Sequence, residues 1–179
     1  MRKESVPLLF SVAGLWWVGS QAVFGEKATG SQKEVGIVSN IKILSGNVDD
    51  VSDVEAWKAS FLKPDMTDRE KAVAVWNSVV QFRHQDVPPK EFLHEDLCVH
   101  DPIKTFNVYG YGQCCCSASN VEALARAAGL NARGRELRGH TVPEVEWKQD
   151  WHMLDASLIS YFIDARGDVA SVNEIAKEV

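Results

Sequence analysis

The chain has 179 residues, of which 45% are hydrophobic and 25% are charged, and its formal net charge is −6. This length and composition are typical of one globular domain with a single packed core, and they argue against a second core. The acidic balance offers no basic patch to a phosphate backbone, so nucleic acid is not an expected partner.

The N-terminus has the order of a signal peptide. Arg2 and Lys3 precede an uncharged stretch whose apolar centre reads PLLFSVAGLWWVG. We expect cleavage near Ala22 to Gly25 and therefore a secreted or periplasmic protein that keeps no stable membrane insertion. The apolar centre is shorter than the roughly 20 residues that span a bilayer, which makes a retained anchor the weaker alternative.

Three ranges then organise the chain: a signal peptide at 1–25, an extended arm at 26–50 and a folded domain at 51–179. Within the arm, VGIVSNIKIL is either a short strand or extended chain. The first stretch of the domain, DDVSDVEAWKASFL, repeats its apolar residues every three or four positions, which predicts a helix that ends before Pro64.

A second helix is predicted in MTDREKAVAVWNSVVQF. Thr67 is followed three places later by Glu70, the capping-box pattern that begins a helix. Val73, Trp76 and Val80 then share one stripe, which we expect to face the core.

The stretch GYGQCCCSASNVEALARAAGL predicts a third helix over about 114–128 that ends at Gly129. Helical phase places Cys114 on the apolar face, Cys115 on the polar face and Cys116 between the two. Cys114 is therefore the thiol expected to point inward. The residues that share its face are Ala118, Val121, Ala125 and Ala128.

The position of Cys114 in the first turn also favours reactivity. Unpaired N–H groups and the positive end of the helix dipole both lower the pKa of a thiol there. Gly110 and Gly112 allow the close backbone approach that such a helix start requires. A buried, unreactive cysteine is the alternative that the helix by itself supports.

Two interpretations of the remaining cysteines are possible, a disulfide and a zinc site. Thiols of exported proteins tend to pair, and neighbours in sequence bridge each other only with strain, so we expect a disulfide from Cys98 to Cys115 or Cys116. The competing reading is a zinc site formed by Cys98, His100 and the cysteine triplet. Consecutive cysteines turn poorly towards one metal ion, and we therefore predict no metal and no cofactor.

The segments ARGRELRGHTVPEVEW and WHMLDASLISYF predict two antiparallel strands around a turn, and they carry His140 and Asp155. A nucleophilic cysteine needs a histidine to take its proton and a carboxylate to orient that histidine. Pairing of residues 145 and 150 sets His140 opposite Asp155. A tighter turn pairs Asp155 with Glu144 and leaves His140 roughly 13 Å away. The register is thus a test of the triad, and Pro143 predicts an edge strand or a bulge.

These residues resemble the transglutaminase-like superfamily. The family pattern has a glycine two places before a cysteine, an alanine four places after it and a helix that ends in an RA-x-G turn. A strand led by histidine follows, and in the strand after it a tryptophan precedes an aspartate. The matching positions here are Gly112, Cys114, Ala118, RAAGLNAR at 126–133, HTVPEV at 140–145 and WHMLD at 151–155.

The resemblance implies an α+β fold with a papain-like core, in which the nucleophile begins a central helix packed on a small antiparallel sheet. It implies Cys114 as nucleophile, His140 as general base and acid, and Asp155 as the group that orients His140. For a second oxyanion donor the candidates are Gln113, Asn107 and Tyr111.

The expected function is an exported cysteine enzyme that transfers or hydrolyses acyl groups of peptide or protein amides through a thioester, as a protease, deamidase or transglutaminase. The alternative is a catalytically degenerate domain that binds proteins. A Cys114 sulfur far from His140, or one locked in a disulfide, would favour that alternative.

Overall fold

The computed structural model describes residues 45–91 and 94–178, which fall within one compact unit of the chain. The predicted signal peptide, its cleavage site and the VGIVSNIKIL segment lie outside the described residues. Within the described ranges, no helix has both the length and the apolar character that crossing a membrane requires.

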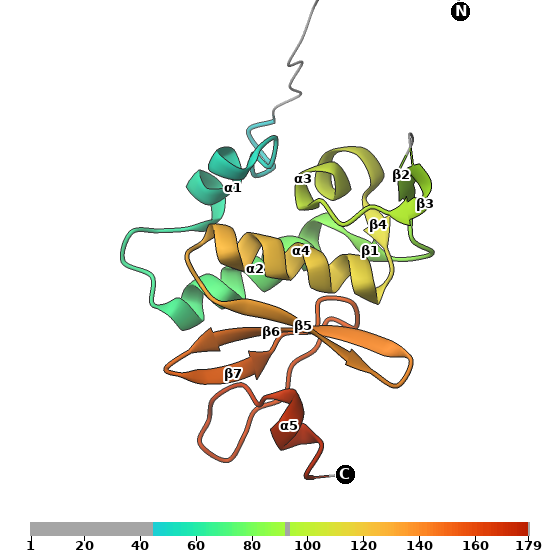
Figure 1. Ribbon diagram of the computed structural model, residues 1–179. Helices are drawn as coiled ribbons and strands as arrows, with labels where there is room; N and C mark the ends of the chain where they lie inside the picture. The colour runs from blue at the N-terminus through green and yellow to red at the C-terminus, as the bar shows by residue number, and fades with distance from the viewer. Residues whose placement is uncertain (1–44, 92–93, 179) are drawn as a thin grey trace, which may run out of the picture. The chain divides into compact units, whose positions relative to one another are not determined.

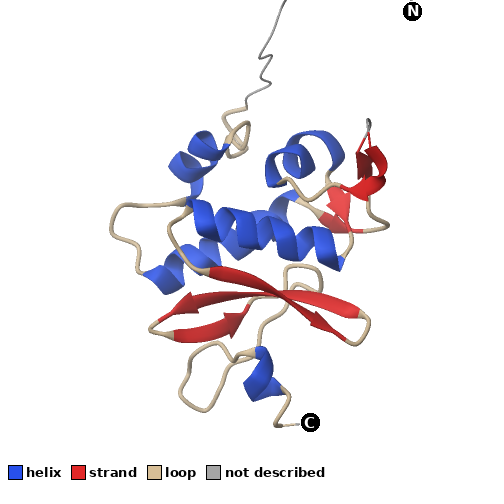
Figure 2. Ribbon diagram, in the orientation of Figure 1, coloured by secondary structure: helices blue, strands red, loops and turns tan. Residues whose placement is uncertain are grey.

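The fold is of the α+β class. Helices α2 and α4 lie side by side over one face of a three-stranded antiparallel sheet, and α5 lies on the other side of that sheet (Figures 1 and 2). The helical elements are α1 (Val54–Phe61), α2 (Asp68–Phe82), α3 (Pro102–Lys104), the π-helix η1 (Thr105–Tyr109), α4 (Cys114–Ala127) and α5 (Val172–Ile175). The strands are β1 (His84–Gln85), β2 (Lys90–Glu91), β3 (His94–Cys98), β4 (Tyr111–Gly112), β5 (Ala132–Leu137), β6 (His140–Trp147) and β7 (Asp150–Met153).

Both N-terminal helices begin and end close to where the sequence predicts. In α2 the capping box is complete: the Thr67 N–H donates to Glu70 Oε2 at 2.8 Å and the Glu70 N–H donates to Thr67 Oγ1 at 3.3 Å. The cap satisfies donors that the first turn of a helix leaves unpaired.

The buried stripe of α2 differs from the predicted one. Its fully buried apolar residues are Ala72, Val75 and Val79, whereas the predicted Val73, Trp76 and Val80 are half-buried at the margin of the core. Two apolar stripes run next to each other on this helix. The choice between them is made by the neighbouring helices, because Trp57 of α1 is fully buried and donates to Ser78 Oγ at 3.0 Å.

The end of α4 is the one predicted. Gly129 has φ +84, a left-handed conformation that glycine adopts without strain. Its N–H donates to the Arg126 carbonyl at 3.0 Å, and the Leu130 N–H donates to the Ala125 carbonyl at 2.9 Å. This pair of bonds is a Schellman motif, which satisfies carbonyls at the helix end. It directs the chain into β5.

The sheet has three strands, one more than predicted, in the order β5-β6-β7. A turn at Gly139, with φ +81, divides the first predicted strand into β5 and β6. Between β6 and β7 a two-residue turn of Lys148 and Gln149, both at positive φ, pairs Trp147 with Asp150. Both predicted registers are therefore wrong: the turn is two residues shorter than the loop of Glu146 to Gln149 in the first prediction, and it lies one residue before the tighter turn in the second.

Pro143 lies in the central strand and not at an edge or a bulge, which corrects the prediction. Its carbonyl accepts from the Leu154 N–H at 3.2 Å. In an antiparallel strand the N–H and C=O of one residue point to the same side. The donor that proline lacks would therefore point towards Leu154, just beyond the end of β7 at Met153, so the missing bond lies at the margin of the β6–β7 ladder.

Candidate active site

The start of α4 is held by a short parallel pairing of β1 with β4, in which Gln85 lies opposite Gly112. Gly110 turns the chain into β4 with φ +72. Gly112 is required for a different reason: a Cβ on it would lie 2.8 Å from the Cβ of Cys116, closer than such atoms approach. Gly112 thus lets the first turn of α4 pack against β4 and fixes the position of Cys114.

His140 and Asp155 form a close pair. His140 Nε2 lies 2.7 Å from Asp155 Oδ2, and the carboxylate is nearly fully buried. The other carboxylate oxygen accepts from the backbone N–H of Ser157 at 2.8 Å and of Leu158 at 3.1 Å. Asp155 is held on both oxygens, so it can fix the orientation of the imidazole.

The pair forms although the register differs from the predicted one. Glu144 lies opposite Met153, so continuing the ladder sets Asp155 level with Val142, two residues along from His140. Residues two apart share a face of the strand, and diagonal neighbours remain within reach of long side chains. His140 and Asp155 therefore share a face of the sheet with Glu144 and Met153, as predicted. The prediction that His140 lies directly opposite Asp155 is wrong.

Cys114 lies next to His140. Burial raises the pKa of its half-buried thiol, but hydrogen bonds from the Thr141 N–H and the His140 side chain outweigh that effect, and the pKa is lower than usual. Burial lowers the pKa of His140, but its bonds to Asp155 and Cys114 outweigh burial and raise it. Because Asp155 holds Nε2, Nδ1 is the nitrogen left for the sulfur. The two shifts favour a thiolate beside an imidazolium.

The other thiols correct two predictions. Cys116, not Cys114, is the fully buried cysteine of the triplet, because its side chain packs against Gly112. Cys114, the first residue of α4, is only half-buried. All four cysteines are free, so the predicted disulfide from Cys98 is not formed. Burial raises the pKa of Cys116 to about 11.

Arg83 is a site residue that the sequence did not reveal. Its buried guanidinium donates to the Gly112 carbonyl at 2.5 Å and to the Ala156 carbonyl at 3.4 Å, and so joins the two segments that carry Cys114 and Asp155. The charge of this guanidinium interacts with Cys114 and with Asp155. Arginine after a helix is common, since a cation there complements the helix dipole, so the sequence carried no signal of this role.

Gln85 belongs to the same network and was also missed. Its Oε1 accepts from Arg83 Nη1 at 3.2 Å and from Ser157 Oγ at 2.8 Å. These bonds fix the amide at the edge of the site, on the strand that pairs with Gly112.

The three predicted oxyanion donors have different surroundings. The Asn107 amide donates to the Val51 carbonyl at 2.7 Å and the Ile103 carbonyl at 2.8 Å, which commits it elsewhere. The ring of Tyr111 packs beside His84. Gln113 is exposed and precedes Cys114 as the N-cap of α4, and it remains the candidate among the three.

Glu144, on the strand that carries His140, serves the fold. It is fully buried and accepts from Arg133 Nε at 2.9 Å and Nη2 at 2.7 Å, and the Val172 N–H donates to it at 2.8 Å. Arg135 approaches the same carboxylate at 3.8 Å. The two arginines are therefore ion-paired with Glu144.

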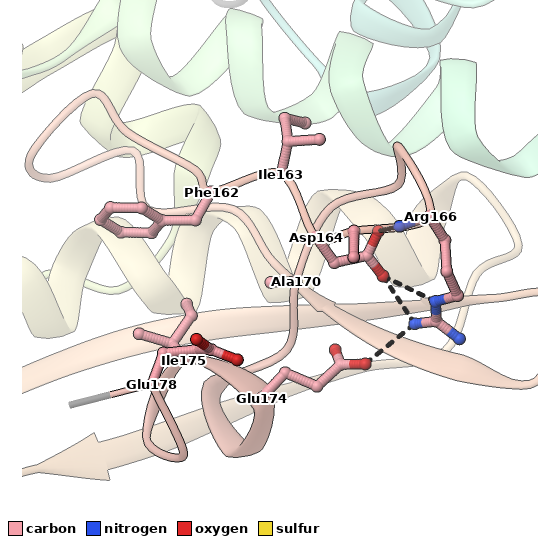
Figure 3. Close-up of a pocket in the computed structure, with 9 residues that line it drawn as sticks. Phe162, Ile163, Asp164, Arg166, Ala170, Glu174, Ile175 and Glu178 are labelled. Atoms are coloured by element: carbon pink, nitrogen blue, oxygen red, sulfur yellow. Dashed lines mark hydrogen bonds and ion pairs between the residues drawn. The ribbon is translucent and has the colours of Figure 1, made fainter.

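A cavity of about 620 Å³ lies away from this site, between α5 and the segment that follows Tyr161 (Figure 3). Phe162 and Ile175 line it, and Arg166 is bonded across it to Asp164 at 2.7 Å and to Glu174 at 2.9 Å. None of Cys114, His140 and Asp155 lines this cavity. The reactive groups lie elsewhere, at the start of α4.

Compared with protein-family models, with curated proteins and with solved structures, the chain matches none of them.

Proposed function

We propose that the protein is a cysteine-dependent enzyme with a papain-like, transglutaminase-like core, which transfers or hydrolyses acyl groups of peptide or protein amides. One observation carries the proposal: His140, whose Nε2 is held 2.7 Å from Asp155 Oδ2, lies close enough to the thiol that begins α4 to lower the pKa of that thiol. Nucleophile, base and orienting carboxylate are the three parts that thiol acyl transfer requires.

In the proposed reaction the Cys114 sulfur attacks the amide carbonyl carbon and forms a tetrahedral oxyanion. Unpaired N–H groups at the start of α4 stabilise that negative charge. His140 gives its proton to the leaving nitrogen, the C–N bond breaks, and a thioester to Cys114 forms. Water or an amine then attacks the thioester, His140 takes the proton of that nucleophile, and the sulfur leaves as thiolate.

The surface beside Asp155 supports a peptide or protein substrate. The Leu158 N–H bonds directly to Asp155, and the side chain of Leu158 is 64% exposed. Two further large apolar side chains follow it before the cavity-lining segment begins at Phe162, and both are exposed: Ile159 and Tyr161. An exposed apolar run next to reactive groups is typical of a surface that contacts another chain.

The geometry argues against the degenerate alternative. A binding module would tolerate a Cys114 sulfur remote from His140 or held in a disulfide, and neither condition applies here. Export of the enzyme stays a prediction from the N-terminal sequence.

Alkylation tests the proposed nucleophile. The reduced protein is treated with limiting iodoacetamide near neutral pH, and the adducts are mapped by mass spectrometry. We expect Cys114 to react faster than Cys98, which serves as an internal control because both side chains are partly exposed. H140A should slow Cys114, whereas H84A, which removes an exposed histidine outside the triad, should not. Equal rates at Cys114 and Cys98 would contradict the proposal.

Turnover tests the reaction itself. Incubation with an unfolded protein and a primary amine should yield either released ammonia, new amine adducts or new chain ends. C114A should abolish whichever product forms and H84A should retain it. A product that persists in C114A would overturn the assignment of the nucleophile.

A further inference from the structure

A second group of chemically reactive side chains lies on the other side of the same helical turn. The ligand atoms of His100, Cys115 and Cys116 all lie within 4.8 Å of one another, and no other such group of metal-ligating side chains occurs in the described ranges. Neither His100 nor Cys115 nor Cys116 belongs to the proposed triad. The function proposed above leaves all three unused.

The spacing of the two sulfurs fits a metal ion better than a bond between them. Cys115 Sγ and Cys116 Sγ are 3.9 Å apart. Sulfurs at about 2.3 Å from a tetrahedral zinc ion are about 3.8 Å from each other, whereas a disulfide requires about 2.05 Å. The sulfurs of these consecutive cysteines therefore lie at a separation that suits one metal ion, contrary to the sequence prediction.

The fold brings His100 to these thiols from a separate segment. Cys115 and Cys116 are in the first turn of α4, and His100 follows β3 and precedes α3. Cys116 is fully buried and Cys115 partly buried, while His100 is exposed. The exposed histidine gives a metal ion a path from solvent to the buried sulfur.

We propose that His100, Cys115 and Cys116 bind one thiophilic metal ion of the zinc type. Two thiolates and an imidazole are ligands that zinc prefers, and a bound ion would join the segment after β3 to the start of α4. The proposal is independent of the triad, because it uses none of its residues.

The fourth tetrahedral position is open to water or to Cys98. Cys98 is two residues before His100, on the strand that leads to it, and its charge acts on Cys116. Its sulfur accepts a hydrogen bond from Lys90 Nζ at 3.6 Å. To bind the metal ion, Cys98 would have to give up its hydrogen bond from Lys90. The C98A variant therefore distinguishes Cys98 from water as the fourth ligand.

The test uses the full chain, reduced and stripped of metal with a chelator, and Co²⁺ as the probe. We expect one Co²⁺ per chain, with the visible bands of a tetrahedral ion and the near-ultraviolet absorption of a thiolate–cobalt bond, both displaced by Zn²⁺. H100A and C115A alter exposed or partly buried residues and should fold, and each should weaken binding at least tenfold, about the least expected when a ligand is lost.

Two variants serve as controls. H84A removes an exposed histidine outside the cluster, and C114A removes the neighbouring thiol, and both should bind Co²⁺ as the unaltered chain does. If C98A also weakens binding, Cys98 is the fourth ligand, and if it does not, the fourth ligand is water. Absence of the thiolate–cobalt absorption, or its persistence unchanged in both H100A and C115A, would overturn the proposal. Loss in C114A alone, with activity lost too, would assign the ion to the triad instead.

Discussion

Two sides of one helical turn carry thiols with different surroundings. Cys114 faces His140 and, through it, the buried Asp155, whereas Cys115 and Cys116 face the exposed His100. Successive residues of an α-helix are rotated by about 100°, so the step from Cys114 to Cys115 replaces His140 with His100 as the neighbour. Three identical residues in a row therefore divide into one thiol beside His140 and two beside His100.

The largest effect is expected at Asp155, whose substitution should impair the triad and leave the proposed metal site unchanged. D155N keeps the shape of the side chain but removes the charge that orients His140, and we expect turnover to fall about 10²- to 10⁴-fold. Co²⁺ binding at His100, Cys115 and Cys116 should not change. The matched control is D86N, since Asp86 lies 4.0 Å from His84 in an exposed His–Asp pair. Similar losses in D155N and D86N would contradict a special role of the buried pair.

The same variant predicts a change in the pH profile. Asp155 raises the pKa of His140, and burial opposes it, so removing the carboxylate lets the pKa fall. The imidazolium would then be lost at a lower pH, and the alkaline limb of turnover against pH should move towards acid. A limb that stays in place would show that another group titrates there.

An intermediate effect is expected at Gly112, which packs against the first turn of α4 and so bears on both Cys114 and the proposed metal site. In G112A the new Cβ would meet Cys116 Cβ at 2.8 Å, so the first turn must move. We expect a loss of about 1–3 kcal/mol in the free energy of unfolding, as for overpacking, with slower Cys114 alkylation and weaker Co²⁺ binding.

The matched control for this variant is G110A. It meets no atom within 4 Å but has φ +72, so it should cost about 1–2 kcal/mol of stability from backbone strain and leave both thiol assays unchanged. Denaturant unfolding and alkylation rates measure both variants. If G110A disturbed the thiols as much as G112A does, the close contact with Cys116 would not be the cause.

The smallest effect is expected at the start of α2, which belongs neither to the triad nor to the proposed metal site. T67A removes the capping box and should cost about 1 kcal/mol of unfolding free energy, measured with urea. Cys114 alkylation and Co²⁺ binding should match those of the unaltered chain. A change in either would mean that the stability of α2, and not local geometry, sets the behaviour of the thiols.

The sequence was informative wherever one local signal decides a structure. Thr67 with Glu70 predicted a helix start, and Gly129 predicted a helix end, because caps depend on residues within one turn. The shared face of His140 and Asp155 followed from the two-residue period of strands. The register did not, since the Lys148–Gln149 turn requires positive φ at two residues that carry no turn signature.

By itself, the sequence determined that a cysteine would stand in the first turn of a helix and that a histidine would lie on a strand after it. The aspartate was predicted within the next strand, but β7 ends at Met153, two residues before Asp155. Only the tertiary structure decided that Cys116 is the buried thiol, that Arg83 joins the two halves of the site, and that His100 approaches the remaining cysteines. The physical reason is range: helical phase and caps are set by neighbouring residues, whereas burial and the meeting of distant side chains depend on how the elements pack.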